Sequence, residues 1–146
     1  MDLIKTIDLA AGGMTAQRTR LNVISMNLAN ANTTKTDDGT AYRRKTVIFE
    51  SNPVETTFSG QLGQSMDDQI HGVKVREVVP VQGELKRIFD PSHPDADKDG
   101  YVFLPNVDVV QEMVHMLNAN RSYEANAAVI RTAKDMALRA LDLLNR

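Results

Sequence analysis

Apolar residues spaced by three and four positions occur at both ends of the chain. Near the N-terminus they are Leu3, Ile7, Met14, Leu21, Ile24 and Leu28. Near the C-terminus they are Val109, Met113, Met116, Tyr123, Ile130, Ala137, Leu141 and Leu144. This spacing lines one side of an α-helix. It predicts a helix over residues 3–30 and a second helix that begins at residue 107 or 108 and ends at residue 144.

The segment between these two helices has a different pattern. Residues 31–41 are polar and rich in turn-forming types, which predicts a loop. Apolar and polar residues alternate over residues 46–49 and over 73–81, which is typical of strands in a hairpin or a three-stranded sheet. Pro91, Pro94 and Pro105 predict an irregular stretch after these strands.

These elements together predict an α+β fold. Long N- and C-terminal α-helices would pack together as a coiled-coil-like layer, with a small β-hairpin-rich segment between them. The expected division is an N-terminal helix over 1–31, a loop and small β-rich segment over 32–106, and a C-terminal helix over 107–146.

Two features of the predicted helices need a special reason. Gly12 and Gly13 together cost about 2 kcal/mol relative to alanine in a helix. They indicate either a hinge or a place where a neighbouring backbone comes very close. Asparagine is a mediocre helix former, yet Asn27 and Asn126 lie within the helices. Asparagines on packed seams can fix the register of two helices through amide hydrogen bonds, whereas exposed ones are simply tolerated.

Composition narrows the class of protein. A chain of 146 residues can bury one core, but only 5% of its residues are aromatic and none is tryptophan. Seven methionines and many alanines must therefore fill the helix seams. The net charge of −2 argues against a nucleic-acid partner. The absence of cysteine excludes disulfides and thiolate metal sites.

The N-terminal segment does not have the pattern of a secretory signal. Asp2, Lys5 and Asp8 interrupt it, and no sufficiently long apolar stretch follows a basic start. No segment approaches the roughly 20 apolar residues that a membrane-spanning helix needs. We therefore expect no membrane span, and any export to proceed without cleavage of a signal peptide.

One acidic segment resembles the start of a calcium-binding loop. Asp95, Asp97 and Asp99 occupy the first, third and fifth positions, and Gly100 the sixth. The twelfth position should be a bidentate glutamate, but it is Asn106. The flanking prolines also disfavour the two helices that such a loop joins. An acidic surface turn is the favoured interpretation, and a soluble cation-binding module that uses Asp95–Asp99 is the alternative.

No catalytic constellation is recognisable in the sequence. His71, His93 and His115 are far apart, and no Ser/His/Asp group, paired carboxylates or phosphate-binding glycine loop is present. The basic triplet Arg43-Arg44-Lys45 is more typical of a solvated strand edge than of a site for phosphate or an acidic partner. We expect no enzyme activity, cofactor or metal. A small enzyme whose site is invisible in the sequence stays a third hypothesis.

Several separated motifs resemble the bacterial flagellar rod and hook family, and within it the short subunits of the proximal rod. The N-terminal motif consists of Asn27, Leu28, Ala29, Asn30, Thr33 and Tyr42 with the following Arg43-Arg44-Lys45. The later motifs are residues 90–97, 100–107, 120–126 and 132–134. The polar stretch Lys35–Ala41 before Tyr42 is longer than in the general rod pattern. The resemblance covers nearly the whole chain.

This resemblance implies a structural subunit of the flagellar rod, the drive shaft that crosses the periplasm. It implies assembly with copies of itself and with other rod subunits, and export without processing through the flagellar type III apparatus. The two apolar rows would then be the subunit interface, because heterologous contacts that do not close produce a helical filament. Each buried Leu or Ile would contribute roughly 1.5–3 kcal/mol to such contacts.

Overall fold

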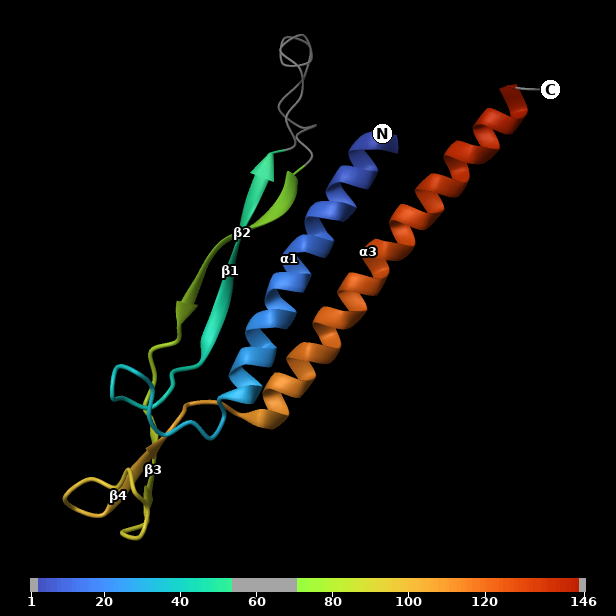
Figure 1. Cartoon of the computed structure of the whole chain (residues 1–146). Coiled ribbons are helices and arrows are strands. Elements are labelled where there is room, and N and C mark those ends of the chain that lie inside the picture. The colour runs from blue at the N-terminus through green and yellow to red at the C-terminus, as the bar shows by residue number, and fades with distance from the viewer. Residues whose placement is uncertain (1–2, 54–70, 145–146) are drawn as a thin grey trace. The chain divides into compact units, whose positions relative to one another are not determined.

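In the part of the chain that the structure describes, a long helix comes first, four strands follow and a second long helix comes last. The computed structural model describes residues 3–53 and 71–144. Its elements are α1 (Leu3–Ala29), β1 (Lys45–Pro53), β2 (His71–Pro80), β3 (Lys86–Phe89), β4 (Tyr101–Leu104) and α3 (Val109–Leu144) (Figure 1). The predicted α+β class, with terminal helices and a small β segment between them, is confirmed. No helix in the described ranges is long and apolar enough to cross a membrane.

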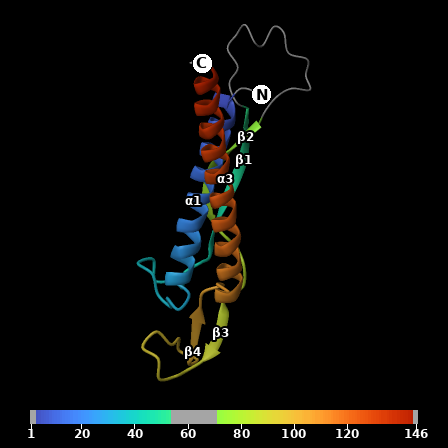
Figure 2. The same ribbon diagram turned by 90° about the vertical axis from the view of Figure 1, so that its right-hand side faces the viewer.

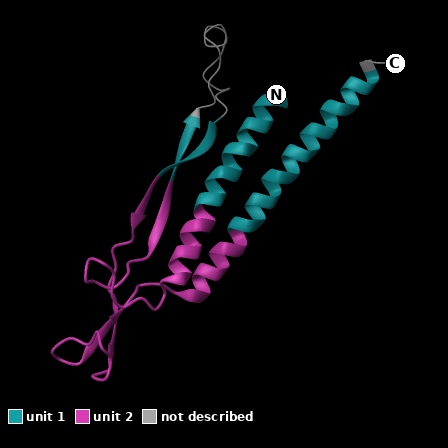
Figure 3. Cartoon of the chain, viewed as in Figure 1, with its two compact units in different colours: residues 1–19, 49–76, 119–146 teal, residues 20–48, 77–118 magenta. Residues whose placement is uncertain are grey.

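The chain forms two compact units, coloured separately in Figure 3. Unit 1 comprises Met1–Thr19, Phe49–Arg76 and Ala119–Arg146, and unit 2 comprises Arg20–Ile48 and Glu77–Asn118. Each unit contains a segment of α1, a segment of α3 and a part of the β1–β2 pair. Within each unit the two helix segments lie side by side in both views (Figures 1 and 2).

Small residues dominate the helix contact in unit 1. Ala10, Ala16, Ala119 and Ala133 are buried. A Cβ atom at Gly13 would lie 2.8 Å from Nδ2 of Asn126, so a side chain there would require the Asn126 amide to move. Small side chains at these positions let the helices pack closely without large anchors, as the scarcity of aromatic residues predicted.

The glycine pair is explained by two different neighbours. Gly13 faces α3, whereas a Cβ at Gly12 would lie 3.4 Å from the backbone oxygen of Val73 in β2. Helix α1 runs without interruption through both glycines. The close neighbour is therefore a side chain, beside Gly13, and not a backbone as predicted, and no break in the helix marks a hinge.

The row of α3 residues that packs within the subunit coincides only partly with the predicted apolar row. Met116, Ile130 and Ala137 are half-buried, as the spacing indicated. The other residues of the packed row are Glu112, Ala119, Asn126 and Ala133, which alternate with them along the helix. The predicted Met113 is exposed. The predicted row was assigned to contacts between subunits, so the exposure of Met113 does not contradict it. Periodicity did not reveal the row that packs within the subunit, because two of its members, Glu112 and Asn126, are polar.

Helix α3 begins with a side-chain cap. Oδ1 of Asp108 accepts hydrogen bonds from the backbone N–H groups of Val110 (2.9 Å) and Gln111 (3.2 Å). These donors have no partner within the helix, so the cap fixes the start of α3 at the predicted position.

The described strands of the β segment form two two-stranded sheets, β1–β2 and β3–β4. The predicted strands over 46–49 and 73–81 lie largely in β1 and β2. The irregular stretch predicted between Pro91 and Pro105 is wrong for its last residues, because Tyr101–Leu104 form β4 and pair antiparallel with β3. Each of these strands has four residues and is stabilised by pairing with the other. The local sequence of such a short strand therefore does not predict it strongly.

Candidate functional site: a buried polar junction

A buried asparagine joins the end of α1 to the chain that enters β1. Asn27 is 1% exposed. Its Oδ1 accepts hydrogen bonds from the backbone N–H of Lys45 (2.8 Å) and from the hydroxyl of Tyr42 (3.0 Å). Its Nδ2 donates to the backbone oxygen of Lys45 (2.8 Å) and to Oε2 of Glu112 (2.9 Å). The Asn27 side chain therefore hydrogen-bonds both backbone groups of Lys45, as a neighbouring strand would, and also contacts α3.

The carboxylate of Glu112 is the charged centre of this junction. Glu112 lies in the first turn of α3 and is 1% exposed. Its Oε1 accepts a hydrogen bond from Nε of Arg44 at 2.7 Å and lies 3.4 Å from Nδ1 of His115. A buried charge needs both a counter-ion and hydrogen bonds, and here Arg44 and Asn27 supply them.

The electrostatic balance keeps Glu112 ionised. Burial by itself raises the pKa of Glu112, but hydrogen bonds from Asn27 and Arg44, the charge of Arg44 and the contact with His115 hold it below its ordinary value. The pKa of the Tyr42 phenol is raised, first by burial and then by the negative charge of Glu112. The junction therefore contains one stable carboxylate and a neutral phenol that donates to Asn27.

A second asparagine extends the junction toward β2. Oδ1 of Asn106 accepts from the backbone N–H of Arg44 (2.8 Å), and Nδ2 of Asn106 donates to the backbone oxygen of Val81 (3.2 Å). The backbone N–H of Val81 in turn donates to the oxygen of Arg44 (2.7 Å). Asn106 thus ties together three segments that are distant in sequence.

The basic triplet has a different role from the one its composition indicated. Arg44 is committed to the junction, so the prediction of a solvated strand edge is wrong for this residue. Arg43 donates to the backbone oxygen of Gly83 at 3.3 Å, and Lys45 is exposed. No local sequence signal indicates that Arg44 pairs with a buried carboxylate 68 residues later.

The helix asparagines divide into structural and tolerated ones. Asn27 confirms the prediction that an asparagine on a packed seam fixes register through its amide. Asn126 packs against Gly13 in unit 1. Asn22 and Asn120 are exposed, so for these two the alternative applies, namely an asparagine tolerated on the helix surface.

The acidic segment is a turn that its own side chains organise. Oδ1 of Asp97 accepts from the backbone N–H groups of Asp99 (2.9 Å) and Tyr101 (2.8 Å). Oδ2 of Asp95 accepts from the hydroxyl of Thr34 (2.7 Å). Gly100 closes the turn at φ +81°, where other residues are strained. No group of three His, Cys, Asp or Glu side chains able to hold a metal ion occurs in the described ranges.

An open hollow of about 440 Å³ lies between the 34–41 loop and the β3–β4 hairpin in unit 2. Thr34, Lys35, Leu85, Asp95 and Phe103 are among its lining residues. Lys35 and Asp95 are the ionisable residues of this lining, and neither a histidine nor a second carboxylate lies beside them.

The residues of the two predicted apolar rows are distributed between the fold and its surface. Ile24 is buried, and Leu3, Ile7, Met14, Leu21 and Leu28 are half-buried. Val109, Met113, Tyr123 and Leu141 keep a large part of their surface exposed, and the side chain of Leu144 lies outside the described part of the chain. Within the motif of the resemblance, Asn27 and Tyr42 meet in the junction, and Thr33 donates to Oδ1 of Asn30 at 3.1 Å.

Comparison with known proteins gives a consistent result over the whole chain. Residues 7–35 match the family described as flagella basal body rod protein, and residues 98–143 match the C-terminal family of the flagellar basal body rod FlgEFG proteins. The flagellar basal-body rod protein FlgC of Borreliella burgdorferi is 43% identical over 99% of both chains. The FlgC proteins of Escherichia coli O6:H1 and Bacillus subtilis are 43% and 36% identical, each over at least 98% of both chains. The chain therefore belongs to the flagellar basal-body rod protein FlgC family.

Proposed function

We propose that this protein is a structural subunit of the flagellar proximal rod and polymerises through its terminal helices into the shaft that transmits motor torque. Its relatives are named as rod proteins, which agrees with a structural role and not with an enzyme. Its neighbours would be copies of itself and other rod subunits. The protein would be made in the cytoplasm and passed, without cleavage of a signal peptide, through the flagellar type III export apparatus to a position that crosses the periplasm.

The observation that carries the assembly mechanism is the exposed apolar surface of α3. The exposed large side chains on this helix are Val109, Val110, Met113, Val114, Leu117, Tyr123, Val129, Met136, Leu138, Leu141 and Leu143. A monomeric helix that packs on one side would normally present polar residues on the other. Apolar surface of this extent indicates burial against other chains.

The exposed residues of unit 2 form a face of their own. Val110, Met113, Val114 and Leu117 follow the spacing i, i+3, i+4, i+7 of one helix face. Glu112 is on the other side of the helix, in the junction. This segment of α3 therefore packs within the subunit on one side and is free to contact a neighbour on the other.

In unit 1 the exposed apolar residues flank the buried row of α3. Val129, Met136 and Leu143 are spaced by seven and lie on one flank, while Leu138 and Leu141 lie on the other. The wide apolar arc suits a helix that is surrounded by several other helices. The near-neutral net charge of −2 keeps repulsion between such packed copies small.

Leu141→Asp tests the interface. Leu141 is 56% exposed, so the substitution should leave the subunit folded and exported. In an assembled rod it would bury a carboxylate without a partner, at a cost of several kcal/mol. We expect rods that lack the variant, and cells that do not swim.

The matched control is Ala128→Asp, which introduces the same group at an exposed position among polar neighbours on α3. Rod composition is measured on isolated basal bodies, and export on the secreted fraction. Normal swimming with full occupancy of Leu141→Asp in the rod would remove this part of α3 from the interface.

A further inference from the structure

One edge of the β3–β4 hairpin presents backbone groups to the outside. The backbone N–H of Asp90 donates to the oxygen of Gly100 at 2.9 Å, next to the Phe89–Tyr101 pair. Hydrogen-bonded and non-hydrogen-bonded pairs alternate along an antiparallel ladder. Ile88 therefore bonds within the hairpin, whereas Arg87 and Phe89 direct their N–H and C=O groups away from β4.

The opposite edge of the hairpin is closed by the acidic turn. The oxygen of Tyr101 accepts from the backbone N–H of Asp97 (2.9 Å), and the N–H of Tyr101 donates to Oδ1 of Asp97 (2.8 Å). Within the described part of the chain, no comparable partner reaches the outward backbone groups of Arg87 and Phe89. All four residues of β3 are exposed, so this strand is an open edge.

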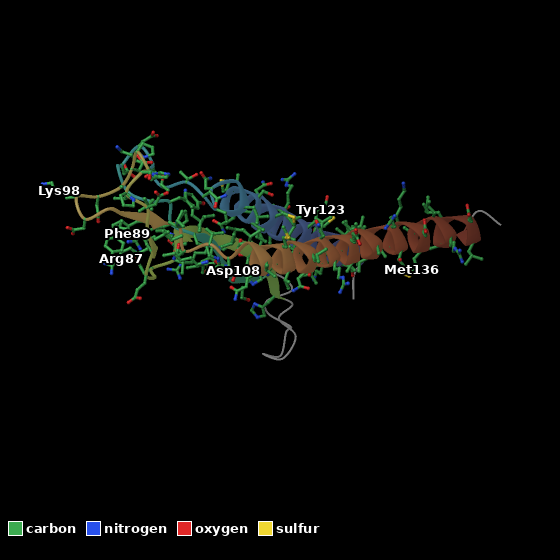
Figure 4. The ribbon with its side chains drawn as sticks, turned by 90° about the horizontal axis from the view of Figure 1, so that it is seen from below. Arg87, Phe89, Lys98, Asp108, Tyr123 and Met136 are labelled. Carbon is green, nitrogen blue, oxygen red and sulfur yellow. The ribbon has the colours of Figure 1, made fainter. Side chains whose placement is uncertain are left out.

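The side chains beside this edge are unusual for a solvent-facing hairpin. The Phe89 ring meets Tyr101 edge-on with centroids 5.3 Å apart, and the Arg87 guanidinium lies 4.6 Å from the Tyr101 ring centre (Arg87 and Phe89 are labelled in Figure 4). Phe103 pairs with Arg87 across the ladder. Three of the chain's aromatic residues, four Phe and three Tyr in all, thus share one face of this small hairpin. Such a surface is typical of an interaction site.

We propose that β3 pairs antiparallel with β3 of a second copy of this chain, about a two-fold axis at Ile88, and so forms a four-stranded sheet. Arg87 of each copy then lies opposite Phe89 of the other, and each pair exchanges both of its outward backbone bonds. Lys86 lies opposite Asp90 of the second copy, and Ile88 packs on its own equivalent. The segment Lys-Arg-Ile-Phe-Asp is therefore complementary to itself.

Neighbouring registers are less favourable. A two-fold axis at Arg87 would place the two guanidinium groups opposite each other, and like charges in that position are destabilising. An axis at Phe89 would place Arg87 opposite Pro91, which has no N–H to donate. Only the axis at Ile88 satisfies both outward residues and pairs opposite charges.

This pairing belongs to the free subunit. A two-fold contact closes on itself, whereas subunits of a polar shaft repeat by heterologous contacts that do not close. The dimer would cover an edge that otherwise templates aggregation, and it would open when the subunit enters the rod. The contact is independent of the α3 surfaces proposed above for assembly.

Disulfide trapping tests the register in the purified full chain. The chain has no cysteine, so Ile88→Cys introduces a single thiol. Directly opposed residues of a non-hydrogen-bonded pair have Cα atoms about 4.5 Å apart, which suits a disulfide. The matched control is Arg87→Cys, whose thiol would lie opposite Phe89 and not opposite its equivalent. We expect roughly tenfold more linked dimer from Ile88→Cys under mild oxidation.

Charge reversal in the Ile88→Cys background gives the second arm. Lys86→Asp should suppress cross-linking, because it faces Asp90 of the second copy, and adding Asp90→Lys should restore it. Hydrogen exchange on the wild type should show that the Arg87 and Phe89 amides gain protection with protein concentration. The Ile88 amide lies inside the hairpin and should be protected at every concentration.

Three results would overturn the proposal. They are equal cross-linking of the two cysteine variants, cross-linking that is insensitive to the charge reversals, or Arg87 and Phe89 amides that stay unprotected at high concentration. The last result would leave the edge to a strand of a different protein. None of these outcomes bears on the Leu141→Asp experiment, which reads rod composition in cells.

Discussion

At the scale of single residues, Asn27 and Glu112 do the most to define this molecule. Both are polar, both are fully buried, and each satisfies the other at 2.9 Å. An apolar pair of similar size could be as stable, but it would not fix which residues meet. The junction therefore specifies the register between the end of α1, the entry to β1 and the start of α3.

Asn27→Ala should destabilise the protein strongly. It would leave Oε2 of Glu112 and both backbone groups of Lys45 without their partner, at a cost of about 2–4 kcal/mol. Urea unfolding followed by circular dichroism measures the change. Asn22→Ala, at an exposed position of the same helix, is the control and should change stability by less than about 0.5 kcal/mol. Equal effects of the two substitutions would show that the junction contributes no net stability.

The lowered pKa of Glu112 predicts loss of stability in acid. The unfolded chain binds a proton to this carboxylate at a higher pH than the folded chain does, so protonation favours unfolding. The contribution is complete above the ordinary glutamate pKa of about 4.3 and is lost as the pH falls through the lower folded value. Glu112→Gln should unfold with a weaker dependence on pH in that window. Parallel stability curves for the two proteins between about pH 6 and pH 3 would contradict this.

At the scale of elements, the two adjacent glycines of α1 have separate functions. A Cβ at Gly12 would lie at ordinary contact distance from β2, whereas a Cβ at Gly13 would require the Asn126 amide to move. The same glycine pair in a solvent-exposed helix would only weaken it. The two glycines therefore mark the places where β2 and α3 contact α1 in unit 1.

Gly12→Ala and Gly13→Ala should differ in sign or size. At Gly12 the better helix propensity of alanine should stabilise by up to about 1 kcal/mol. At Gly13 the added methyl group must displace Asn126 from its packed position, which should cancel or reverse this gain. The free energies of unfolding of both variants, and of Gly13→Ala combined with Asn126→Ala, measure the coupling. If Gly13→Ala stabilised as much as Gly12→Ala, the helix contact would be looser than the structure indicates.

At the scale of the whole molecule, α3 packs within the fold through a narrow row, and most of its large apolar residues are exposed. In unit 2 the exposed face includes Val110, which is 71% exposed, and in unit 1 exposed apolar residues lie on both flanks of the buried row. A subunit with several separate apolar faces is suited to contact several neighbours at once. This is the property that a rod subunit requires and a soluble monomer avoids.

Val114→Asp tests whether the unit 2 face is a second interface. Val114 is exposed on the side of α3 opposite the junction, so the melting temperature of the purified subunit should stay unchanged. Its incorporation into rods should fail because the carboxylate would be buried against a neighbour. Gln111→Asp, one turn earlier at an exposed polar position, is the control. Rods that contain Val114→Asp at full occupancy would limit the interface to the unit 1 faces.

The sequence by itself determined the two long terminal helices, the presence of a β segment between them and the family. Period-3.6 spacing over many residues is a strong local signal, and the motifs around Asn27 and Tyr42 carry the resemblance directly. The tertiary structure alone decided the buried row of α3, the partners of Arg44 and the β3–β4 hairpin. Each of these depends on residues far apart in the chain. Glu112 resembles a surface glutamate until Asn27 and Arg44 are brought beside it, because a polar residue becomes favourable inside a protein only through its partners.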